Sequence, residues 1–250
     1  GGDCDSAAPA RAEHHKEEIM ASAVIICKGE FPKREYPLYL IQSADYIICC
    51  DGAAATYDRR QGKIFGHERK PDAVIGDLDS ISPAMKRKYA DVLVKVDEQD
   101  YNDLNKAVRY ALTRYEDIDS IHILGAGGMR EDHTVGNLSY LMEYAKELDG
   151  LKERAILDGI NVRPELYIDM VSDWTTAFAI TDSCSFHVGE GREISIFSAD
   201  NALKIKSEGL TWKTDNVVFD NWWKATLNKA CADEVRLTLS HPSAVLIILN

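Results

Sequence analysis

The feature that most constrains the fold is a series of short, apolar runs separated by longer amphipathic segments. The runs are AVIIC (23–27), YIICC (46–50), AVIG (73–76), VLVKV (92–96) and SIHIL (120–124). Runs of this length, rich in β-branched residues, are typical of strands buried on both faces of a parallel sheet. The intervening segments have helical spacing, most clearly at 103–115 and 133–148. Alternating strands and helices predict a doubly wound α/β domain with a mostly parallel sheet.

The texture changes after about residue 165, where short strand-like runs follow one another with polar turns and no convincing helix. The runs are ELYIDMV (165–171), TTAFAIT (175–181), CSFHV (184–188), REISIFS (192–198), ALKIKS (202–207), VVF (217–219), EVRLTLS (234–240) and AVLIILN (244–250). This spacing predicts a β-sandwich or a barrel, and the sandwich is the form adopted in the predicted organisation. The predicted organisation is therefore a disordered leader or expression remnant (1–21), an α/β domain (22–165) and a β-sandwich domain (166–250).

Charge and composition exclude several classes of function. The chain has 29 Lys and Arg against 41 Asp and Glu, a net charge of -12. This argues against a nucleic-acid or membrane partner, either of which favours a basic face. No apolar run approaches the roughly 20 residues that span a bilayer, and the N-terminal segment lacks the apolar core of a signal peptide. The six cysteines form no CxxC pair, which favours reduced thiols and a cytoplasmic protein.

Polar or glycine-rich residues directly follow four of the predicted strands. YIICC runs into Asp51 and Gly52, AVIG into 77–80, VLVKV into 97–100, and SIHIL into 125–128. In open α/β sheets, ligands bind in the crevice beyond the carboxyl ends of the strands. Four such ends on one edge predict a single binding site.

The carboxylates of this region suit a hard cation. Asp77 and Asp79 are two residues apart, so in an extended loop they would face one way and share an ion. Asp100 and Asp103 are three apart at a predicted helix start, which makes them neighbours on one face. Either could instead serve only as a helix cap or dipole partner, and Lys106 could be a phosphate ligand or a surface ion pair. Clustered oxygen ligands without Cys or His pairs favour Mg²⁺ bridging to phosphate.

The segment GAGGMREDHT (125–134) lies between a predicted strand and a predicted helix. Glycines let a backbone approach phosphates closely, and the following helix start attracts anions. Arg130 adds a fork suited to phosphate oxygens. Asp132, His133 and Thr134 add a helix cap, a donor and a hydroxyl. A glycine-rich turn alone is a weak signal, and its polar neighbours make it a candidate phosphate loop.

These motifs resemble those of the thiamine pyrophosphokinase family. DGAAATY (51–57), PDAVIGDLDSI (71–81), EQDYNDLNKAV (98–108) and GAGGMREDHTVGN (125–137) occur in that family's order, and GREISIFS and EGLTWKTDN are similar to its C-terminal β-sandwich. The resemblance implies transfer of the pyrophosphoryl group of ATP to the hydroxyl of thiamine, with release of AMP. It also implies Mg²⁺ and a homodimer that binds thiamine between its subunits.

The resemblance also implies roles for individual residues. The catalytic carboxylates would be Asp77, Asp79, Asp100 and Asp103, of which Asp77, Asp79 and Asp103 would also hold the metal. The nucleotide would be bound by Asp51, Gly52, Ser80, Lys106, Gly125, Arg130, Asp132, His133 and Thr134. Thiamine would be bound by Gln99, Trp222 and Asp233. An amide such as that of Gln99 both donates to and accepts from an aminopyrimidine.

The sequence departs from the family pattern in two motifs. The family's G-G-x-G-G-R contains Ala126 and Met129 here, and its S-N-E reads Ala232-Asp233-Glu234. Trp212, Trp222 or Trp223 would suit a cationic thiazolium. Each also fits a role in the sandwich core or a dimer interface.

The same residues also fit two other functions. A metal-dependent phosphoesterase also uses Asp-rich strand ends with an Asp-His pair, but such enzymes usually carry more His ligands than His133 alone. A non-catalytic nucleotide-binding module would bind ATP without turnover. The spread of acidic residues over several loops favours catalysis.

Overall fold

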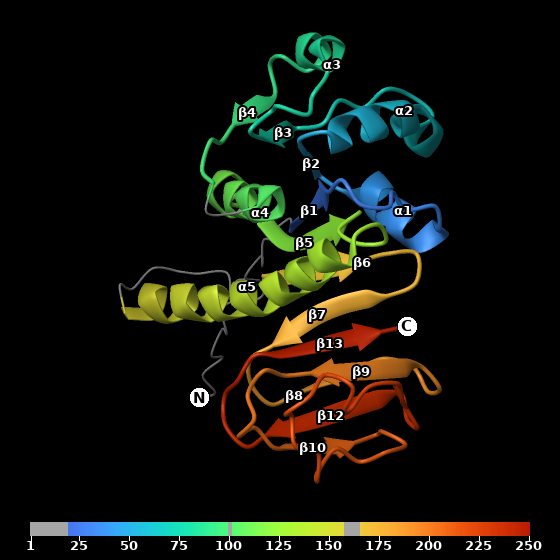
Figure 1. The fold of residues 1–250 in the computed structure, drawn as a ribbon, viewed down its shortest axis with the longest axis vertical. Helices are drawn as coiled ribbons and strands as arrows, with labels where there is room; N and C mark the ends of the chain where they lie inside the picture. The colour runs from blue at the N-terminus through green and yellow to red at the C-terminus, as the bar shows by residue number, and fades with distance from the viewer. Residues whose placement is uncertain (1–19, 100–101, 158–165) are drawn as a thin grey trace, which may run out of the picture.

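The computed structural model describes residues 20–99, 102–157 and 166–250, with side chains 150–157 excepted. Within them a ten-stranded sheet has the order β11-β9-β13-β7-β6-β5-β1-β2-β3-β4, and a three-stranded sheet has the order β10-β12-β8 (Figure 1). The strands are β1 (Ala21–Ile26), β2 (Tyr46–Cys50), β3 (Ala73–Gly76), β4 (Leu93–Lys95), β5 (Ile118–Leu124), β6 (Tyr167–Val171), β7 (Thr176–Ile180), β8 (Cys184–His187), β9 (Glu193–Phe197), β10 (Ile205–Glu208), β11 (Asn228–Lys229), β12 (Glu234–Leu239) and β13 (Val245–Leu249).

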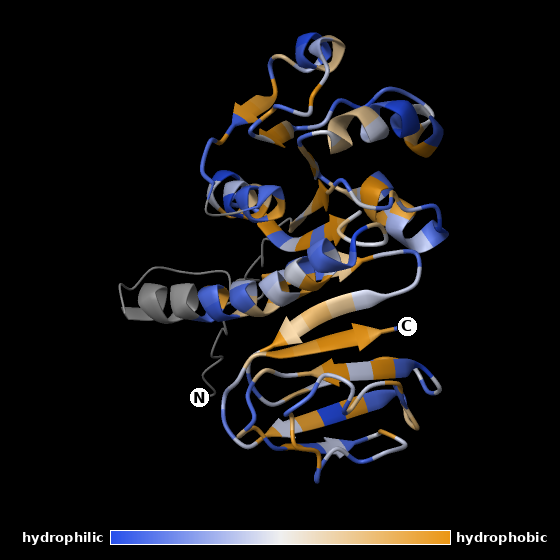
Figure 2. Cartoon of the chain, viewed as in Figure 1, coloured by the Kyte–Doolittle hydropathy of each residue, from blue (hydrophilic) through white to orange (hydrophobic). Residues whose placement is uncertain are grey.

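The part of the long sheet from β6 to β4 is parallel and has helices on both faces. Helices α1 (Glu35–Ser43), α2 (Ala53–Phe65) and α3 (Pro83–Lys88) belong to one side, and α4 (Asp103–Arg114) and α5 (Glu131–Leu157) to the other (Figure 1). An apolar cluster lies on each face of this sheet, and successive residues of β1 pack alternately into one and the other. This arrangement, apolar in its strands and polar on the outer faces of its helices (Figure 2), confirms the predicted doubly wound α/β fold.

Helix α4 shows how the sequence sets one of these elements. Asn102 caps it, because its side chain accepts a hydrogen bond from Asn105 N at 2.9 Å. Four residues at helical spacing are buried against β1, β2 and β3: Leu104, Ala107, Val108 and Ala111. The predicted helix at 103–115 is confirmed, and its cap is Asn102 rather than a neighbouring aspartate. Helix α5 begins two residues earlier than predicted and continues nine residues further.

The second half of the chain is antiparallel and forms a two-layered sandwich. The β10-β12-β8 sheet packs on the β9–β13 end of the long sheet through a shared core that includes Ile194, Ile205, Val235 and Ile247. Strand β6 joins the halves, because it pairs in parallel with β5 and antiparallel with β7. The β-sandwich prediction is confirmed, and one of its layers is a continuation of the α/β sheet. The boundary between residues 165 and 166 stays a prediction.

One predicted strand is wrong and one was missed. VVF at 217–219 is a turn region in which Val217 N donates to Thr214 O, while Phe219 is buried in the sandwich core. Phe219, with Val217 packed against the same core, therefore anchors a loop, whereas Val218 is exposed. Strand β11 has only two residues, too few for a periodic signal. In the described residues, the cysteines are all free and no helix is long and apolar enough to cross a membrane. Residues 1–19 lie outside the described chain.

Candidate active site

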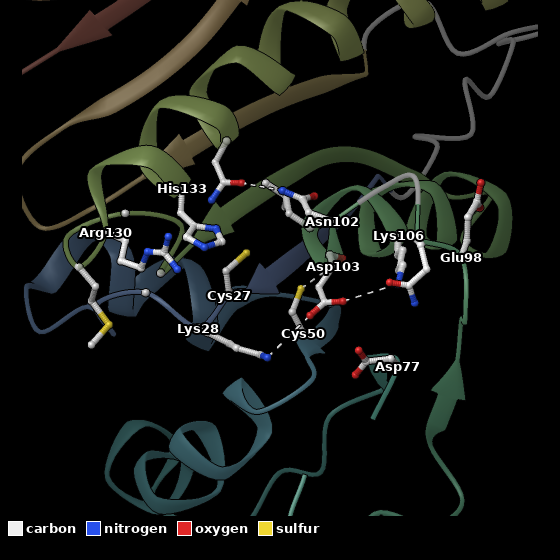
Figure 3. Close-up of a pocket in the computed structure, with 17 residues that line it drawn as sticks. Cys27, Lys28, Cys50, Asp77, Glu98, Asn102, Asp103, Lys106, Arg130 and His133 are labelled. Carbon is white, nitrogen blue, oxygen red and sulfur yellow. Dashed lines mark hydrogen bonds and ion pairs between the residues drawn. The ribbon is translucent and has the colours of Figure 1, made fainter. Parts of the chain in front are cut away.

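A cavity of about 560 Å³ lies at the carboxyl ends of the parallel strands. It opens where the strand order reverses, between β1 and β5, which is the position expected for a ligand site in a doubly wound sheet. Its lining residues are Cys27, Lys28, Gly29, Cys50, Asp77, Glu98, Gln99, Asn102, Asp103, Leu104, Lys106, Gly125, Gly127, Met129, Arg130, His133 and Asn137 (Figure 3). Carboxylates and lysines gather at one end, and the glycine loop with Arg130 and His133 forms the other.

Asp51 is a buried carboxylate behind the acidic end of the cavity. It follows β2, is 2% exposed, and has a positive φ of 42°, a conformation that Asp tolerates better than most residues. Its Oδ2 accepts hydrogen bonds from Lys28 Nζ at 3.2 Å and Ser80 Oγ at 2.6 Å. Its Oδ1 is buried and has no hydrogen-bond partner. A buried carboxylate oxygen without a donor is costly, so this atom is a site where a cation would be stabilising.

Asp77 and Asp79 do not lie in an extended loop. Leu78 between them has φ 68° and is anchored in the core beneath, and Asp77 Oδ1 accepts the Asp79 N–H at 2.9 Å. This hydrogen bond lowers the pKa of Asp77. Asp77 lines the cavity, whereas Asp79 is exposed and does not. The two side chains therefore differ in position, contrary to the expectation that both face one way.

Asp103 begins α4 and lies between two lysines. Its carboxylate is 3.8 Å from Lys28 Nζ and 3.8 Å from Lys106 Nζ. Burial raises the pKa of Asp103, and the carboxylates of Asp51 and Asp77 add to that rise, while the lysines oppose it. The last residue of β3 is glycine because a Cβ at Gly76 would lie 3.0 Å from Asp51 Cβ and 3.3 Å from Asp103 Oδ1. Three strand ends thus bring their carboxylates together.

The two lysines are held differently. The Lys106 side chain is 6% exposed, and its Nζ donates to Val96 O at 3.0 Å. The Lys28 side chain is 46% exposed and reaches across the mouth of the cavity (Figure 3). Lys106 is therefore a fixed positive charge, and Lys28 is one with room to move.

The glycine loop packs tightly on the segment that follows β1. Gly29 N donates to Gly125 O at 2.6 Å, and Glu30 N donates to Gly127 O at 2.9 Å. A Cβ at Gly29 would lie 2.3 Å from Gly125 O and 2.5 Å from Gly127 O, so only glycine fits there. The loop ends at α5, whose N-terminus faces the same cavity.

The polar residues at the start of α5 are partly engaged with one another. Arg130 Nη2 donates to Asp132 Oδ2 at 2.6 Å, and the Thr134 hydroxyl donates to Arg130 O at 3.0 Å. Asp132 Oδ1 also accepts the His133 N–H at 2.9 Å. Arg130 and His133 line the cavity, whereas Asp132 and Thr134 do not line it and instead hydrogen-bond to these two residues.

Sequence reasoning missed Lys28, Asn102 and Asn137. Lys28 follows the first predicted strand, so the rule that identified the other strand ends would have found it. Asn102 Nδ2 donates to Asn137 Oδ1 at 3.1 Å, and Asn137 Nδ2 donates to Ala126 O at 2.8 Å. This relay joins the start of α4 to the glycine loop. No sequence signal pairs two asparagines 35 positions apart.

Comparisons with known proteins agree on one family. The model of the thiamin pyrophosphokinase catalytic domain matches residues 38–150, and the model of the thiamin pyrophosphokinase substrate-binding domain matches residues 176–247. Together they cover more than half of the chain.

The chain belongs to the thiamin pyrophosphokinase family.

Curated relatives carry the name of this same family, and a solved structure shares the fold. The chain is 28% identical to thiamine pyrophosphokinase 1 of Oryza sativa over 219 residues, covering 78% of the chain and 75% of the relative. It is 31% identical to thiamin pyrophosphokinase 1 of Caenorhabditis elegans over 154 residues, covering 58% of the chain and 59% of the relative. The crystal structure of yeast thiamin pyrophosphokinase shares the fold, with a TM-score of 0.70 at 16% identity, over 94% of this chain and 87% of that one. Members of this family are enzymes that make thiamine diphosphate.

The residues that family resemblance connects with thiamine fall in two places. Gln99 lines the cavity, and its Nε2 donates to Asp97 O at 3.2 Å. Trp222 and Asp233 lie in the antiparallel half and do not line the cavity; Trp222 is 59% exposed, and Asp233 Oδ2 is 3.0 Å from His187 Nδ1. Asp100 lies outside the described residues.

The oxygen ligands at the acidic end are of the kind that bind a hard divalent cation, although their side chains do not converge on one coordination site. In the described residues, no group of three or more His, Cys, Asp or Glu side chains is arranged to hold a metal ion. The unpartnered, buried Asp51 Oδ1 and the cavity-lining Asp77 and Asp103 provide the oxygen ligands that Mg²⁺ prefers. The Lys28 ammonium stands among these carboxylates.

Proposed function

We propose that this chain transfers the pyrophosphoryl group of ATP to the hydroxyl of thiamine, giving thiamine diphosphate and AMP, in the cavity at the carboxyl ends of β1, β2, β3 and β5. The observation that carries the proposal is the division of one cavity into an acidic end with two lysines and a glycine loop with Arg130 and His133. Anionic phosphates with a bound cation match this distribution of charge.

In the proposed complex, the phosphates of ATP lie along the loop 125–128 at the N-terminus of α5. The glycine backbone permits close approach, and the helix start favours negative charge. Arg130 exchanges part of its contact with Asp132 for phosphate oxygens, and His133 donates from the first turn. Asp51, Gly52 and Ser80 shape the far side of the nucleotide site, and Thr134 fixes the backbone at Arg130.

The residues proposed to hold Mg²⁺ are Asp77, Asp79 and Asp103, with Asp51 beside them. Bound there, Mg²⁺ would supply charge neutralisation for the phosphates. Lys106, held by Val96 O, keeps a positive charge at this end of the cavity throughout. Because phosphoryl-type transfer demands little covalent work from the protein, these side chains act by positioning the reactants and by stabilising charge.

Proton transfer from the thiamine hydroxyl is assigned to a carboxylate near the acidic end. Asp100 is the proposed base. Asp103, whose pKa is raised by burial and by its acidic neighbours, is the described carboxylate best suited to share this work. Gln99 is placed to hold the aminopyrimidine.

Thiamine is proposed to lie between two subunits of a homodimer. In support, Trp222 and Asp233 are exposed in the antiparallel half of the chain and away from the cavity, so they would approach a cavity only from a second copy. The proposed enzyme is cytoplasmic and has no nucleic-acid or membrane partner, which the net charge of -12 supports.

The test is product analysis of the purified protein with Mg-ATP, with and without thiamine. Equimolar AMP and thiamine diphosphate, both dependent on thiamine, are expected. ADP or free phosphate formed without thiamine would contradict the proposal and favour a phosphoesterase. ATP binding with no product would favour a binding module.

A further inference from the structure

We propose that Lys28 is a tethered cation that competes with divalent metal for the carboxylates of Asp51 and Asp103, so that the metal enters with the nucleotide rather than ahead of it. The inference rests on the proposed function, because it concerns how that site is loaded. Lys28 acts on the carboxylates that bind the metal and is therefore a positioning residue.

The first argument is the set of atoms that Lys28 contacts. Its Nζ is 2.8 Å from Ser80 Oγ, 3.2 Å from Asp51 Oδ2 and 3.8 Å from Asp103 Oδ2. These oxygens come from three separate segments, which follow β2, follow β3 and begin α4. A divalent cation bound to Asp51 and Asp103 would use the same carboxylates and lie within a few ångströms of the ammonium. Two cations at that separation repel, so the ammonium and the metal compete for one position.

The second argument is that Lys28 supplies a positive charge to the buried carboxylate of Asp51 through its Oδ2. The Ser80 hydroxyl donates to Asp51 Oδ2 at 2.6 Å, so its oxygen is free to accept from Lys28. Lys28 thereby neutralises Asp51, which is 2% exposed and would otherwise be a buried charge without a cation. The ammonium thus provides part of the charge neutralisation that a metal ion would provide.

The third argument is the contrast with Lys106. Lys106 reaches Asp103 from the opposite side (Figure 3), is 6% exposed and is held by Val96 O. Lys28 is 46% exposed, and its ammonium is held by the side chains of Asp51 and Ser80. Only Lys28 has the freedom to leave the carboxylates without unfolding its surroundings.

The fourth argument is the place to which Lys28 can move. Its neighbours Cys27 and Gly29 donate backbone hydrogen bonds to Leu124 O and Gly125 O, so the base of the side chain is fixed beside the glycine loop. A lysine side chain that starts beside this loop is long enough for its ammonium to reach phosphates bound along the loop. On binding of Mg-ATP, the Lys28 ammonium would leave the carboxylates, which would then hold the metal, and would move to the phosphates, so that both cations keep an anionic partner.

The decisive experiment measures Mn²⁺ binding to the full chain without nucleotide, using the electron paramagnetic resonance signal of free Mn²⁺. Lys28→Met removes the charge and keeps the length of the side chain. Its expected Kd for Mn²⁺ is about tenfold lower than that of the wild type, since a competing cation has been removed. Lys28→Arg should retain the weak binding of the wild type. Lys146→Met, which removes a lysine paired with Glu143 on α5, is the matched control and should leave Mn²⁺ affinity unchanged.

Kinetics give the second readout. Lys28→Met should raise the KM for Mg-ATP by about tenfold, because the phosphates lose the relocated ammonium, while free Mg²⁺ protects the variant from thermal unfolding at lower concentrations than it protects the wild type. Mn²⁺ affinity in Lys28→Met that equals or falls below that of the wild type would overturn the inference. If Lys28→Met shows no gain in Mn²⁺ affinity while the wild type forms thiamine diphosphate normally, the proposed function stands and only the inference fails. A wild type that forms no thiamine diphosphate would instead overturn the proposed function.

Discussion

The two ends of the long sheet differ in where their strands finish. From β6 to β4 the strands run parallel, so their carboxyl ends meet at one edge and bring Lys28, Asp51, Asp77 and Gly125 together. In the antiparallel half, neighbouring strands end at opposite edges, and polar groups such as Asp200, His241 and Ser243 form a small cluster of their own away from the cavity. Parallel pairing therefore gathers distant loops into one site, whereas antiparallel pairing disperses them.

The halves also differ in how their strands are buried. Strands β1 and β2 are enclosed by helices on both faces, whereas β12 alternates between buried and exposed residues along its length. A strand that alternates in this way presents one face to solvent or to a partner. The proposed function places catalysis in the parallel half and recognition across a subunit interface in the antiparallel half. The following predictions test that division.

The largest effect is expected from Asp77→Asn at the acidic end of the cavity. Loss of a principal electrostatic group should lower kcat by about 10²–10³-fold, or about 3–4 kcal/mol of transition-state stabilisation. Asp182→Asn, in the turn between β7 and β8, is the matched control in the antiparallel half and should leave kcat unchanged. Steady-state kinetics would decide, and near-normal turnover of Asp77→Asn would contradict the assignment of the chemistry.

Core substitutions in each half test whether the continuous sheet unfolds as one unit. Ile25→Ala in β1 and Ile247→Ala in β13 each remove a side chain that is fully buried. Each should lower the free energy of unfolding by about 3 kcal/mol. Because β6 is hydrogen-bonded to both halves, both variants should keep a single transition in denaturant, followed by circular dichroism and by tryptophan fluorescence. Two separated transitions would show that the halves are independent.

Trp222→Ala tests the role of the antiparallel half in recognition. It should raise the KM for thiamine about tenfold, equivalent to about 1.4 kcal/mol, because a cationic thiazolium would lose an aromatic face. The KM for Mg-ATP should stay constant. Trp212→Ala and Trp223→Ala provide matched comparisons, since both residues are similarly exposed. If either of these, rather than Trp222, raised the KM for thiamine, the residue assignment would be wrong.

The smallest effect is expected from the Asp58 cluster on α2, which is remote from the cavity lining. Burial alone would raise the pKa of Asp58, but hydrogen bonds from Lys88, Tyr89 and Gln61 outweigh it and lower that pKa. A lowered carboxyl pKa contributes stability above the ordinary Asp value near 4, and that stability is lost as the pH falls through the folded-state pKa.

Asp58→Asn should therefore reduce the free energy of unfolding on the order of 1 kcal/mol at neutral pH. The difference from the wild type should shrink as the pH falls below 4, while thiamine diphosphate formation stays unchanged. Denaturant titrations between pH 3 and pH 7 would measure it. A difference that does not depend on pH would mean that the stability comes from packing rather than from charge.

Several features of the fold followed from local pattern. The strand runs at 46–50 and 73–76 match β2 and β3 residue for residue. The stripe of Leu104, Ala107 and Val108 on α4 is buried against the sheet, as predicted. These predictions succeeded because periodicity reports burial directly. VVF at 217–219 failed for the same reason: a buried apolar anchor in a loop has the composition of a strand without its pairing.

The site was predictable to the extent that strand ends mark it. Asp51, Asp77, Asp103 and Arg130 were singled out because each follows a strand or lies at a helix start, and Lys106 because it is three residues after Asp103. Lys28 obeys the same rule and was overlooked. The separation of Asp77 from Asp79 was not predictable, because it depends on Leu78 being drawn into the core and adopting a positive φ.

The sequence by itself determined which segments are strands and helices, which strand ends are polar, and which family's motifs the chain carries. These are local properties, set by hydrophobic period and by residue type within a few positions. Only the tertiary structure decided that Lys28 contacts Asp51 and Ser80, that Asn102 is tied to Asn137, and that one sheet runs through both halves. Those outcomes depend on strand order and register, which bring residues far apart in the chain within hydrogen-bonding distance and leave no local trace in the sequence.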